Sequence, residues 1–332
     1  MFKFGISSAK QLAPAHLDGF FKSRKFIALD LYNSLDQHSA AERDKIQERI
    51  LCRFSNQNRT IRYTHNHRFD EFDTLAASSI VSTYGTKRNI RVHDVGASDG
   101  RTSCDLYNRL NQIYGANLSF FASDYAPYLY ILRRRGSANR LIVDAQDNVL
   151  QIIVPPFVFN VVRRESKVFY PLNHLIHPLV RRFYAEPLLG VYRAGNADID
   201  RVRLDLLCKE CRSNLASNSN FHFDSYDIFK GPTESFDVVR AMNVLNRDYF
   251  SEEQLRKAIE NIAVSLNAGG LLITGSNTEA GTTVNGGIYQ KKGARFERLG
   301  ASGSGSQVDA LITAASDRGS AVSSADSASL VA

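Results

Sequence analysis

The stretch that decides the fold is VHDVGASDGR, residues 92–101. An apolar run ends in an acidic residue, turns through Gly-x-Ser-x-Gly and opens a helical pattern at Arg101. The turn needs small residues, because its backbone must approach a ligand closely and adopt positive φ. Ligands of open α/β sheets bind at the carboxyl ends of the strands, where such a turn lies. The stretch therefore predicts a strand, a turn and a helix, with either a bound ligand or a purely structural tight turn at their junction.

Apolar runs and helical patterns alternate along most of the chain. We expect strands at 88–96, 118–124, 221–229, 236–245 and 271–277, and helices at 101–115 and 251–270. Strands that alternate with helices favour βαβ units and a mostly parallel sheet. The predicted fold class is therefore a doubly wound α/β fold.

The composition is that of a folded soluble protein. The chain has 332 residues, of which 43% are hydrophobic and 23% charged, which is too apolar for a disordered chain. Its 41 Lys and Arg against 34 Asp and Glu give a net charge of +7, a mild excess that does not favour a nucleic-acid partner. No apolar run has the length of a signal peptide or a spanning helix, so we expect a cytoplasmic protein.

Three segments depart from the α/β alternation. Residues 1–85 have helical patterns and are predicted to form an N-terminal helical cap. Residues 151–197 hold five of the eight prolines and six basic residues against two acidic ones, which predicts an insertion at about 140–205 within a domain of residues 86–315. Residues 316–332 are rich in Ser and Ala, and we expect a disordered tail.

Two classes of ligand compete for the turn at Gly96. A dinucleotide fingerprint, G-x-G-x-x-G, would need glycines where the chain has Ser98 and Arg101, so a nicotinamide oxidoreductase is not favoured. The turn instead resembles motif I of the class I S-adenosylmethionine-dependent methyltransferases, hD-x-G-x-G/S-x-G. Asp94, Gly96, Ser98 and Gly100 occupy its four defining positions.

Later segments extend this resemblance. FFASD ends at Asp124, where that family places a carboxylate that binds both ribose hydroxyls. A YDIF segment is similar to its D-h-F element, which implies that Asp227 holds the adenine amino group and Ile228 packs against the ring. Asn243 follows the expected fourth strand, and LNAGG at 266–270 is similar to the family's L-x-x-G-G. The resemblance implies S-adenosyl-L-methionine as cofactor, bound also by Asn243, and a Rossmann-like seven-stranded sheet with the insertion after its second strand.

A closer resemblance is to the chemotaxis receptor glutamate methyltransferases. Their G-x-S-x-G turn and their N-V-L region are similar to residues 96–100 and 243–245. The chain departs from them at Arg101, where that family has Glu, and at Met242, where it has Arg. We therefore carry over the cofactor site and not the substrate.

The implied reaction is an SN2 transfer of the sulfonium methyl group. Because the methyl donor is already activated, orientation can supply most of the acceleration, and we assign no catalytic residue. No Asn/Asp-Pro-Pro-Tyr/Phe occurs at Asn243, which disfavours amide and exocyclic amine acceptors. We expect an oxygen, carboxylate or carbon acceptor on a small molecule or a protein. The alternative is a non-catalytic interaction protein on the same fold that docks a partner through residues 151–197.

The histidines and cysteines do not predict a metal site. THNH at 64–67 precedes Asp70, Glu71 and Asp73, but His-x-His in a charged segment is more typical of a surface or a lid. Cys208-x-x-Cys211 is a single pair in an expected helix, and no second ligand pair accompanies it.

The insertion is both basic and aromatic. Arg163, Arg164, Arg181 and Arg182 alternate with Phe and Tyr, and His174 and His177 share a helical spacing. The simplest interpretation is an amphipathic segment that packs on the domain. The same pattern also suits a cover over the substrate cleft or peripheral contact with an anionic membrane.

Overall fold

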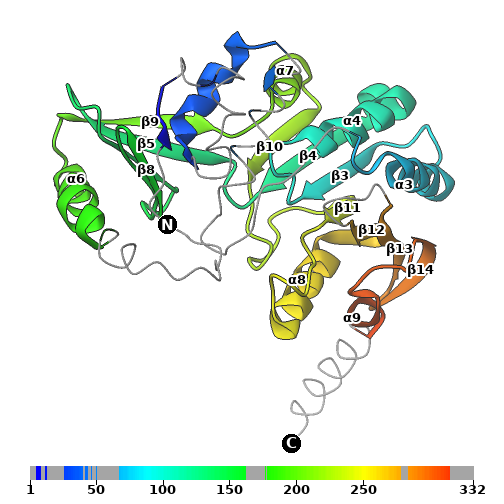
Figure 1. Cartoon of the computed structure of the whole chain (residues 1–332). Coiled ribbons are helices and arrows are strands. Elements are labelled where there is room, and N and C mark those ends of the chain that lie inside the picture. The colour runs from blue at the N-terminus through cyan, green and yellow to red at the C-terminus, as the bar shows by residue number, and fades with distance from the viewer. Residues whose placement is uncertain are drawn as a thin grey trace, which may run out of the picture. The chain divides into compact units, whose positions relative to one another are not determined.

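The structure is a computed structural model of the chain (Figure 1). It describes residues 5–8, 12, 26–39, 42–43, 46, 50, 67–161, 176, 178–277 and 283–314. The chain divides into two compact units. The antiparallel-sheet unit comprises Met1–Tyr63 and Ala126–Leu206, and the parallel-sheet unit comprises Thr64–Tyr125 and Leu207–Ala332.

The parallel-sheet unit is built on a seven-stranded sheet of order β10-β4-β3-β11-β12-β13-β14. Five parallel strands come first, in spatial order β10 (Phe221–Ser225), β4 (Leu118–Asp124), β3 (Ile90–Val95), β11 (Phe236–Met242) and β12 (Leu266–Ser276). An antiparallel hairpin of β13 (Asn285–Lys292) and β14 (Arg295–Ser302) completes the sheet. The predicted α/β class and the mostly parallel seven-stranded sheet are confirmed.

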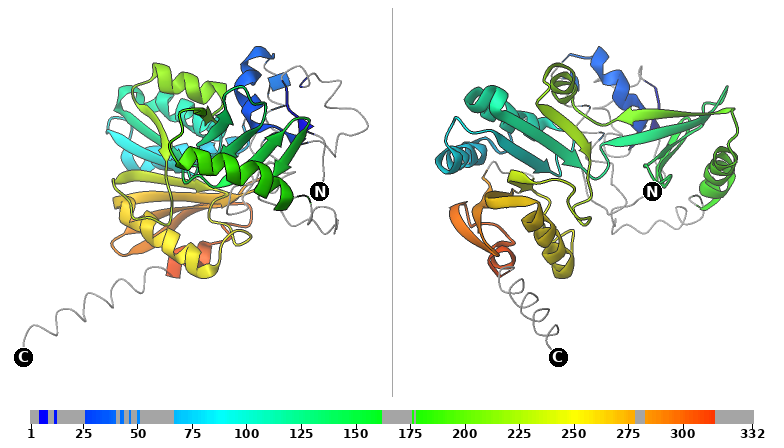
Figure 2. Two further views of the ribbon diagram at one scale, coloured as in Figure 1. Left: turned by 90° about the vertical axis from the view of Figure 1, so that its left-hand side faces the viewer. Right: turned by 180° about the vertical axis from the view of Figure 1, so that it is seen from behind.

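Helices cover both faces of this sheet (Figures 1 and 2). One face carries α3 (Asp70–Tyr84), α4 (Arg101–Tyr114) and α7 (Lys209–Ser217), and the short helix η4 (Gly115–Asn117) follows α4. The other carries α8 (Glu252–Ser265) and α9 (Asp309–Ala314). Helix α8 begins at a capping box of Ser251 and Gln254, and its Leu255, Ile259 and Ile262 are buried against the sheet.

The strand register brings the carboxyl ends of the parallel strands to one edge. Val95 lies opposite Ser123, and Asp124 lies opposite Ser225. The strand order reverses at β3, whose two neighbours are β4 and the much later β11. Such a reversal is where open α/β sheets bind their ligands. The turn after Val95 therefore lies where a ligand site is expected.

The antiparallel-sheet unit has a five-stranded sheet of order β8-β7-β6-β5-β9. Its strands are β5 (Tyr128–Arg134), β6 (Arg140–Val143), β7 (Val149–Val154), β8 (Phe157–Asn160) and β9 (Ile199–Asp205). The π-helical turn η5 (Arg181–Ala185) and α6 (Glu186–Arg193) pack on one face through Ala185 and Leu189. The unit thus has its own sheet and its own hydrophobic core.

The N-terminal segment packs on the other face of the same sheet. It forms the strand pair β1 (Gly5–Ile6) and β2 (Phe26–Ile27) and the 3-10 helix η3 (Leu29–Gln37). Buried Gln151 of β7 accepts a hydrogen bond from the Leu29 N–H at 2.8 Å and donates to the Ile27 carbonyl at 3.2 Å. Segments more than a hundred residues apart in sequence therefore share one core.

The structure differs from three expectations. The described N-terminal residues include a strand pair, so the purely helical cap is corrected, because their apolar side chains pack on a sheet from the insertion. The division into units differs from the predicted limits, since α3 falls in the parallel-sheet unit and the insertion begins at Ala126 rather than at about 140. The helix expected around Cys208 and Cys211 covers residues 202–216, but residues 202–205 belong to β9 and the helix α7 begins only at Lys209.

Some expectations are not addressed by the described residues. The predicted tail at 316–332 lies outside them, as do Arg163, Arg164, His174 and His177. No helix in the described ranges is long and apolar enough to cross a membrane.

The Gln151 contacts lead to a stability prediction. Gln151→Ala leaves the buried Leu29 N–H without its acceptor, so we expect it to lower the free energy of unfolding by about 1–3 kcal/mol. Urea denaturation of the full chain measures this change. Gln146→Ala is the matched control, because the Gln146 side chain is exposed between β6 and β7 of the same unit. Equal midpoints for the two variants would contradict the role given to Gln151.

Candidate functional site

The turn after β3 is held in a conformation that small residues allow. Gly96, Ser98 and Gly100 all have positive φ, of 76°, 57° and 87°. The Gly96 and Ala97 N–H groups both donate to the Ser123 carbonyl at 2.8 Å, which anchors the turn to the end of β4. A Cβ on Gly96 would lie 2.0 Å from Val244 Cγ2. Glycine is therefore required here both by φ and by space.

The far end of the turn is equally crowded. Gly100 is the N-cap residue of α4, and a Cβ on it would lie 2.6 Å from Cys211 Sγ and 2.9 Å from Cys211 Cβ. Cys104, Cys208 and Cys211 are buried and form no disulfide. A hydrogen bond with the Cys104 thiol, together with burial, holds the pKa of Cys208 well above its usual range. These thiols therefore pack against the turn as neutral side chains and are poor nucleophiles.

Asp124 closes the turn from the neighbouring strand. Its Oδ2 accepts a hydrogen bond from the Ser98 backbone N–H at 2.9 Å. The Asp124 carbonyl also accepts from the Tyr226 N–H at 3.0 Å, which ties the start of the YDIF segment to the same edge. The structure thus joins the motif turn and the predicted ribose carboxylate by a direct hydrogen bond.

Asp227 and Ile228 follow β10 at this edge. Half-buried Asp227 accepts a hydrogen bond from the Phe229 N–H at 3.0 Å, which shapes its own loop. Ile228 is buried in the core under α8, and its carbonyl accepts from Asn261 Nδ2 at 2.9 Å. The adenine roles predicted for these two residues stay predictions.

Asn243 follows β11 with a positive φ of 58°. Its Nδ2 donates to Asn277 Oδ1 at 3.3 Å, and the Asn277 N–H donates to Asn243 Oδ1 at 3.2 Å. Arg68 Nε donates to the same Asn277 Oδ1 at 2.9 Å. The Asn243 amide is thus oriented by Asn277, a residue that no sequence motif indicates.

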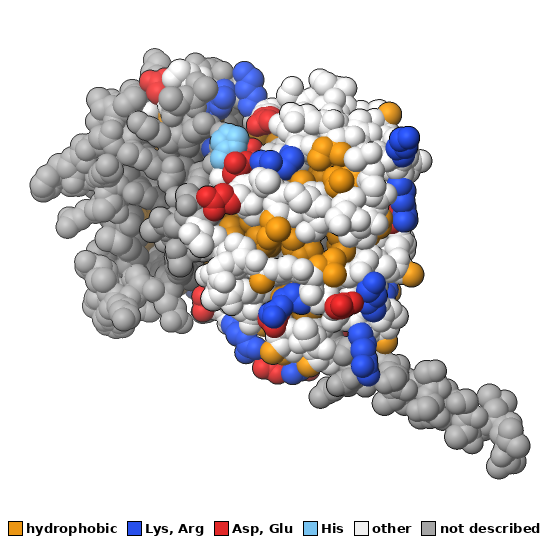
Figure 3. Space-filling view, turned by 90° about the vertical axis from the view of Figure 1, so that its right-hand side faces the viewer, with side chains coloured by type: hydrophobic (Ala, Val, Ile, Leu, Met, Phe, Trp, Pro, Cys, Tyr) orange, Lys and Arg blue, Asp and Glu red, His pale blue; other side chains and the backbone are white. Residues whose placement is uncertain are grey.

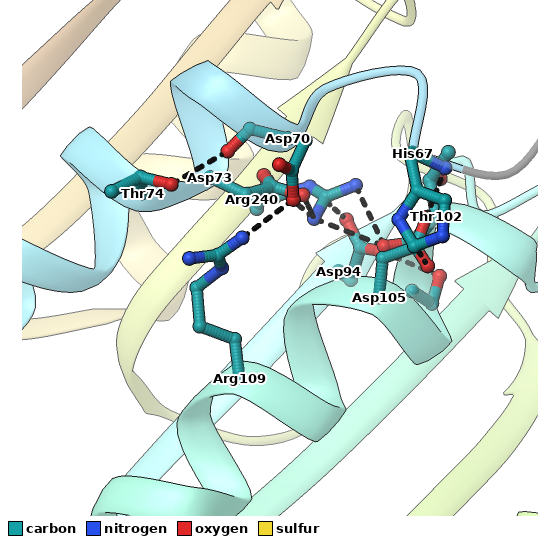
Figure 4. A network of polar contacts seen from close by, with 10 residues as sticks. His67, Asp70, Asp73, Thr74, Asp94, Thr102, Asp105, Arg109 and Arg240 are labelled. Carbon is teal, nitrogen blue, oxygen red and sulfur yellow. Dashed lines mark hydrogen bonds and ion pairs between the residues drawn. The ribbon is translucent and has the colours of Figure 1, made fainter.

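Asp94 points into the protein rather than toward the turn (Figure 4). Its Oδ2 accepts a hydrogen bond from the Ser103 hydroxyl at 2.6 Å, and its Oδ1 lies 3.2 Å from Arg240 Nε in an ion pair. Arg240 is fully buried and donates to Asp73 Oδ1 at 3.1 Å and to the Thr102 carbonyl at 3.3 Å. The sequence placed Asp94 in the cofactor site, and the structure places its carboxylate in a buried polar network.

This network joins three elements around one guanidinium. Asp73 comes from α3, Asp94 from β3 and Thr102 from the first turn of α4. Burial raises the pKa of Asp73 to about 7, opposed by the Arg240 guanidinium and reinforced by Asp94. Burial also raises the pKa of Asp94, against Arg240 and the Ser103 hydroxyl. The Arg240 guanidinium thus pairs with two buried carboxylates, Asp73 and Asp94, and this shortage of positive charge favours protonation of one of them.

Exposed contacts join α4 to α3 and to the turn just before α3 (Figure 4). The His67 N–H donates to Asp105 Oδ2 at 2.8 Å, and Arg109 pairs with Asp70. Of the histidine segment considered as a metal candidate, residues 64–66 lie outside the described residues. Among the described residues no group of three or more His, Cys, Asp or Glu could hold a metal ion.

A pocket of about 480 Å³ lies beside β4 and β10 and contains none of the eight predicted cofactor residues. It is lined by aromatic and polar side chains, among them His93, Phe121, His222, Tyr226 and Phe236. Burial lowers the pKa of His93 to about 4, so the ring is neutral, and its Nε2 lies 2.8 Å from Ser123 Oγ. The pocket is therefore separate from the predicted cofactor residues.

The surface in Figure 3 mixes both signs of charge. On the described part of that face, Lys and Arg side chains are interspersed with Asp and Glu and with hydrophobic side chains. Mixed charge of this kind is ordinary for a solvated surface.

No protein-family model and no curated protein matches the chain. Solved structures of similar fold include the CurJ carbon methyltransferase, with 15% identity over 63% of this chain and 36% of that chain and a TM-score of 0.32. They also include the N-methyltransferase NodS from Bradyrhizobium japonicum WM9 in complex with S-adenosyl-L-homocysteine, with 14% identity over 74% of this chain and 72% of that chain and a TM-score of 0.31.

A further similar structure is SAM-bound CalS10, an amino pentose methyltransferase from Micromonospora echinaspora, with 11% identity over 75% of this chain and 82% of that chain and a TM-score of 0.32. The chain spans little more than a third of the CurJ structure. Identities this low do not transfer an activity to this chain. None of these three is described as a chemotaxis receptor methyltransferase, so that closer resemblance stays a prediction.

The crowded glycine leads to a test that separates strain from steric overlap. Gly100 and Gly115 cap the two ends of α4 with positive φ, but only at Gly100 would an added Cβ have atoms within 4 Å. Gly115 has a sparsely populated backbone conformation (φ 53°, ψ −124°), so we expect Gly115→Ala to cost about 1–3 kcal/mol. Gly100→Ala should add about 1–3 kcal/mol of overpacking against Cys211. Urea denaturation measures both losses, and a loss at Gly100 no larger than the backbone cost of about 1–2 kcal/mol would contradict the packing described there.

The buried network leads to a pH dependence. The pKa of Asp73 is about 7 in the folded protein against an ordinary 3.8. Asp73 therefore loses its proton at a higher pH in the folded protein than in the unfolded chain. This contribution to stability is complete below 3.8 and is lost as the pH rises to about 7. Asp73→Asn should remove that part of the slope.

Unfolding free energy measured by urea denaturation between those pH values tests this expectation. Asp70→Asn is the control, because Asp70 lies on the same helix with an exposed side chain and should retain the wild-type slope. A wild-type slope in Asp73→Asn would show that Asp73 does not titrate in this range.

Proposed function

We propose that this protein is a methyltransferase that binds S-adenosyl-L-methionine over the carboxyl ends of β3, β4, β10 and β11. The single observation that carries the proposal is the hydrogen bond between the Ser98 N–H and Asp124. It joins a glycine turn after one parallel strand to a carboxylate at the end of the next. This arrangement suits a nucleoside whose ribose lies against the carboxylate and whose remainder passes over the turn.

The residues at this edge fit that ligand. The Ser98 hydroxyl is buried and has no hydrogen-bond partner among the described residues, so a polar ligand group would satisfy it. The glycines at 96 and 100 let the turn pack directly on Val244 and Cys211, which fixes the turn's position at this edge. Asp124 offers a carboxylate, which can accept hydrogen bonds from two vicinal hydroxyl groups.

When bound, S-adenosyl-L-methionine supplies a methyl group activated by a positively charged sulfur. The chain's part is to bind and orient the reactants, which can supply most of the acceleration of an SN2 transfer. In this proposal Asp124 holds the ribose, the turn at 96–100 fixes the middle of the ligand, and Asp227 and Ile228 receive the adenine. Asp94 acts through the turn, because its bond to Ser103 joins the two ends of that turn.

The acceptor proposed is an oxygen, carboxylate or carbon atom on a small molecule or a protein. At the exit of β11 the Asn243 amide is bonded to Asn277. The lack of an Asn/Asp-Pro-Pro-Tyr/Phe motif at this exit is what disfavours amide and exocyclic amine acceptors. Incubating a cell lysate with the protein and radiolabelled S-adenosyl-L-methionine, then separating protein, lipid and small molecules, distinguishes the acceptor classes.

The alternative, a non-catalytic protein that docks a partner through residues 151–197, is distinguished by ligand binding rather than by deletion. Removing those residues would remove most of β7 and all of β8 and would unfold the antiparallel sheet. Failure to bind the cofactor product, together with no methylation of any fraction, would favour the alternative.

Calorimetry with S-adenosyl-L-homocysteine tests the cofactor site. We expect wild-type protein to bind it and Asp124→Ala to bind about 10- to 100-fold more weakly, because hydrogen bonds to a charged group contribute about 1.5–3 kcal/mol. Asp224→Ala is the matched control, since Asp224 is an exposed carboxylate on the adjacent strand. Undiminished binding by Asp124→Ala, or no binding by wild type, would overturn the proposal.

A further inference from the structure

The helical segment at 178–193 of the antiparallel-sheet unit has two different faces. It consists of a helical turn at 178–180, η5 and α6, and we call it the arginine helix. Ala185 and Leu189 are buried and pack against the sheet, with Tyr192 partly buried beside them. Figures 1 and 2 show α6 lying along one face of that sheet. The inward face is therefore a normal packing surface.

The outward face of the arginine helix is also apolar. Leu179, Phe183 and Val191 are 51%, 65% and 36% exposed, and Tyr184 is 42% exposed. Leu179, Phe183, Pro187 and Val191 recur every four residues, a spacing that places them along one side of a helix. Among the described residues, Phe183 is the most exposed of the large aromatic side chains. A row of this kind marks an interaction surface, because the described core residues of the unit do not include it.

Positive charge flanks this row. Arg181, Arg182 and Arg193 are exposed, and Glu186 is the one acidic residue in the segment 178–193. Arg181 lies 3.5 Å from Glu186 in an exposed ion pair, which contributes little to stability. Arg182 and Arg193 are exposed and have no ion pair with a described residue.

We propose that the arginine helix is a peripheral docking surface for an anionic lipid membrane. An apolar row with an exposed aromatic ring, flanked by arginines, is the pattern of a helix that lies in the plane of a membrane interface. Phe183 and Leu179 would enter the boundary of headgroups and acyl chains, and the arginines would contact lipid phosphates. Nucleic acid would use the arginines but would leave the aliphatic row exposed to water. This surface is independent of the proposed methyl transfer.

A fluorescent reporter can test this directly, because the chain contains no tryptophan. Phe183→Trp places the single indole on the proposed surface, and Leu299→Trp places it at another exposed apolar position on β14. We expect vesicles of phosphatidylcholine mixed with phosphatidylglycerol to shift the Phe183→Trp emission to the blue. They should leave the Leu299→Trp emission unchanged.

Cosedimentation with the same vesicles tests the charges and the apolar row in the wild-type background. Phe183→Ser should abolish most binding, and Arg182→Gln should weaken it about fivefold, consistent with about 1 kcal/mol for one arginine near an anionic surface. Arg134→Gln is the matched control, as an exposed arginine on β5 of the same unit. Added salt should weaken wild-type binding.

Three results would overturn the proposal. They are no binding of wild type to anionic vesicles, equal binding to vesicles of phosphatidylcholine alone, and binding that is unchanged in both Phe183→Ser and Arg182→Gln. Since these side chains are exposed, circular dichroism should show that both variants keep the fold. Loss of calorimetric binding to S-adenosyl-L-homocysteine would concern the other site and would leave this result intact.

Discussion

The ion pairs of Arg240 are the interaction on which the parallel-sheet unit depends. The guanidinium is buried and contacts Asp73 of α3, Asp94 of β3 and the Thr102 carbonyl of α4. A buried charge without partners is very costly, so each of these groups requires the others. The turn at 96–100 lies between Asp94 and Thr102, so the network holds both of its ends. A structural requirement of the interior thereby sets the geometry of the candidate site.

The two units differ in the kind of sheet on which each is built. The parallel sheet brings five carboxyl ends to one edge, which is why its turns can hold residues of distant segments close together. The antiparallel sheet instead builds a separate core from an insertion and the N-terminal segment. The insertion leaves directly after the strand that ends at Asp124 and returns before α7. Because the inserted unit has its own core, it can lie between β4 and α7 in the sequence without interrupting the parallel sheet.

Local patterns predicted much of the parallel sheet and little of the antiparallel one. The strand that ends in Asp94 and the one that ends in Asp124 were predictable, because each is a short apolar run bounded by turn residues. The role of Arg240 was not predictable. Its partner Asp73 lies 167 residues away in the sequence, and no local pattern around an arginine in a strand indicates such a partner. Asn277 was missed for the same reason, since only the fold brings it to Asn243.

By itself, the sequence determined the class of the fold and the position of the motif turn, because strand and helix periodicity and the demand for small residues at a turn are local properties. The tertiary structure decided what those residues do. It turned Asp94 inward to Arg240, joined Ser98 to Asp124, and combined the N-terminal segment with the insertion through Gln151. Each of these depends on groups far apart in sequence that meet only when the sheets form. Burial and charge pairing, which no local pattern records, made those choices.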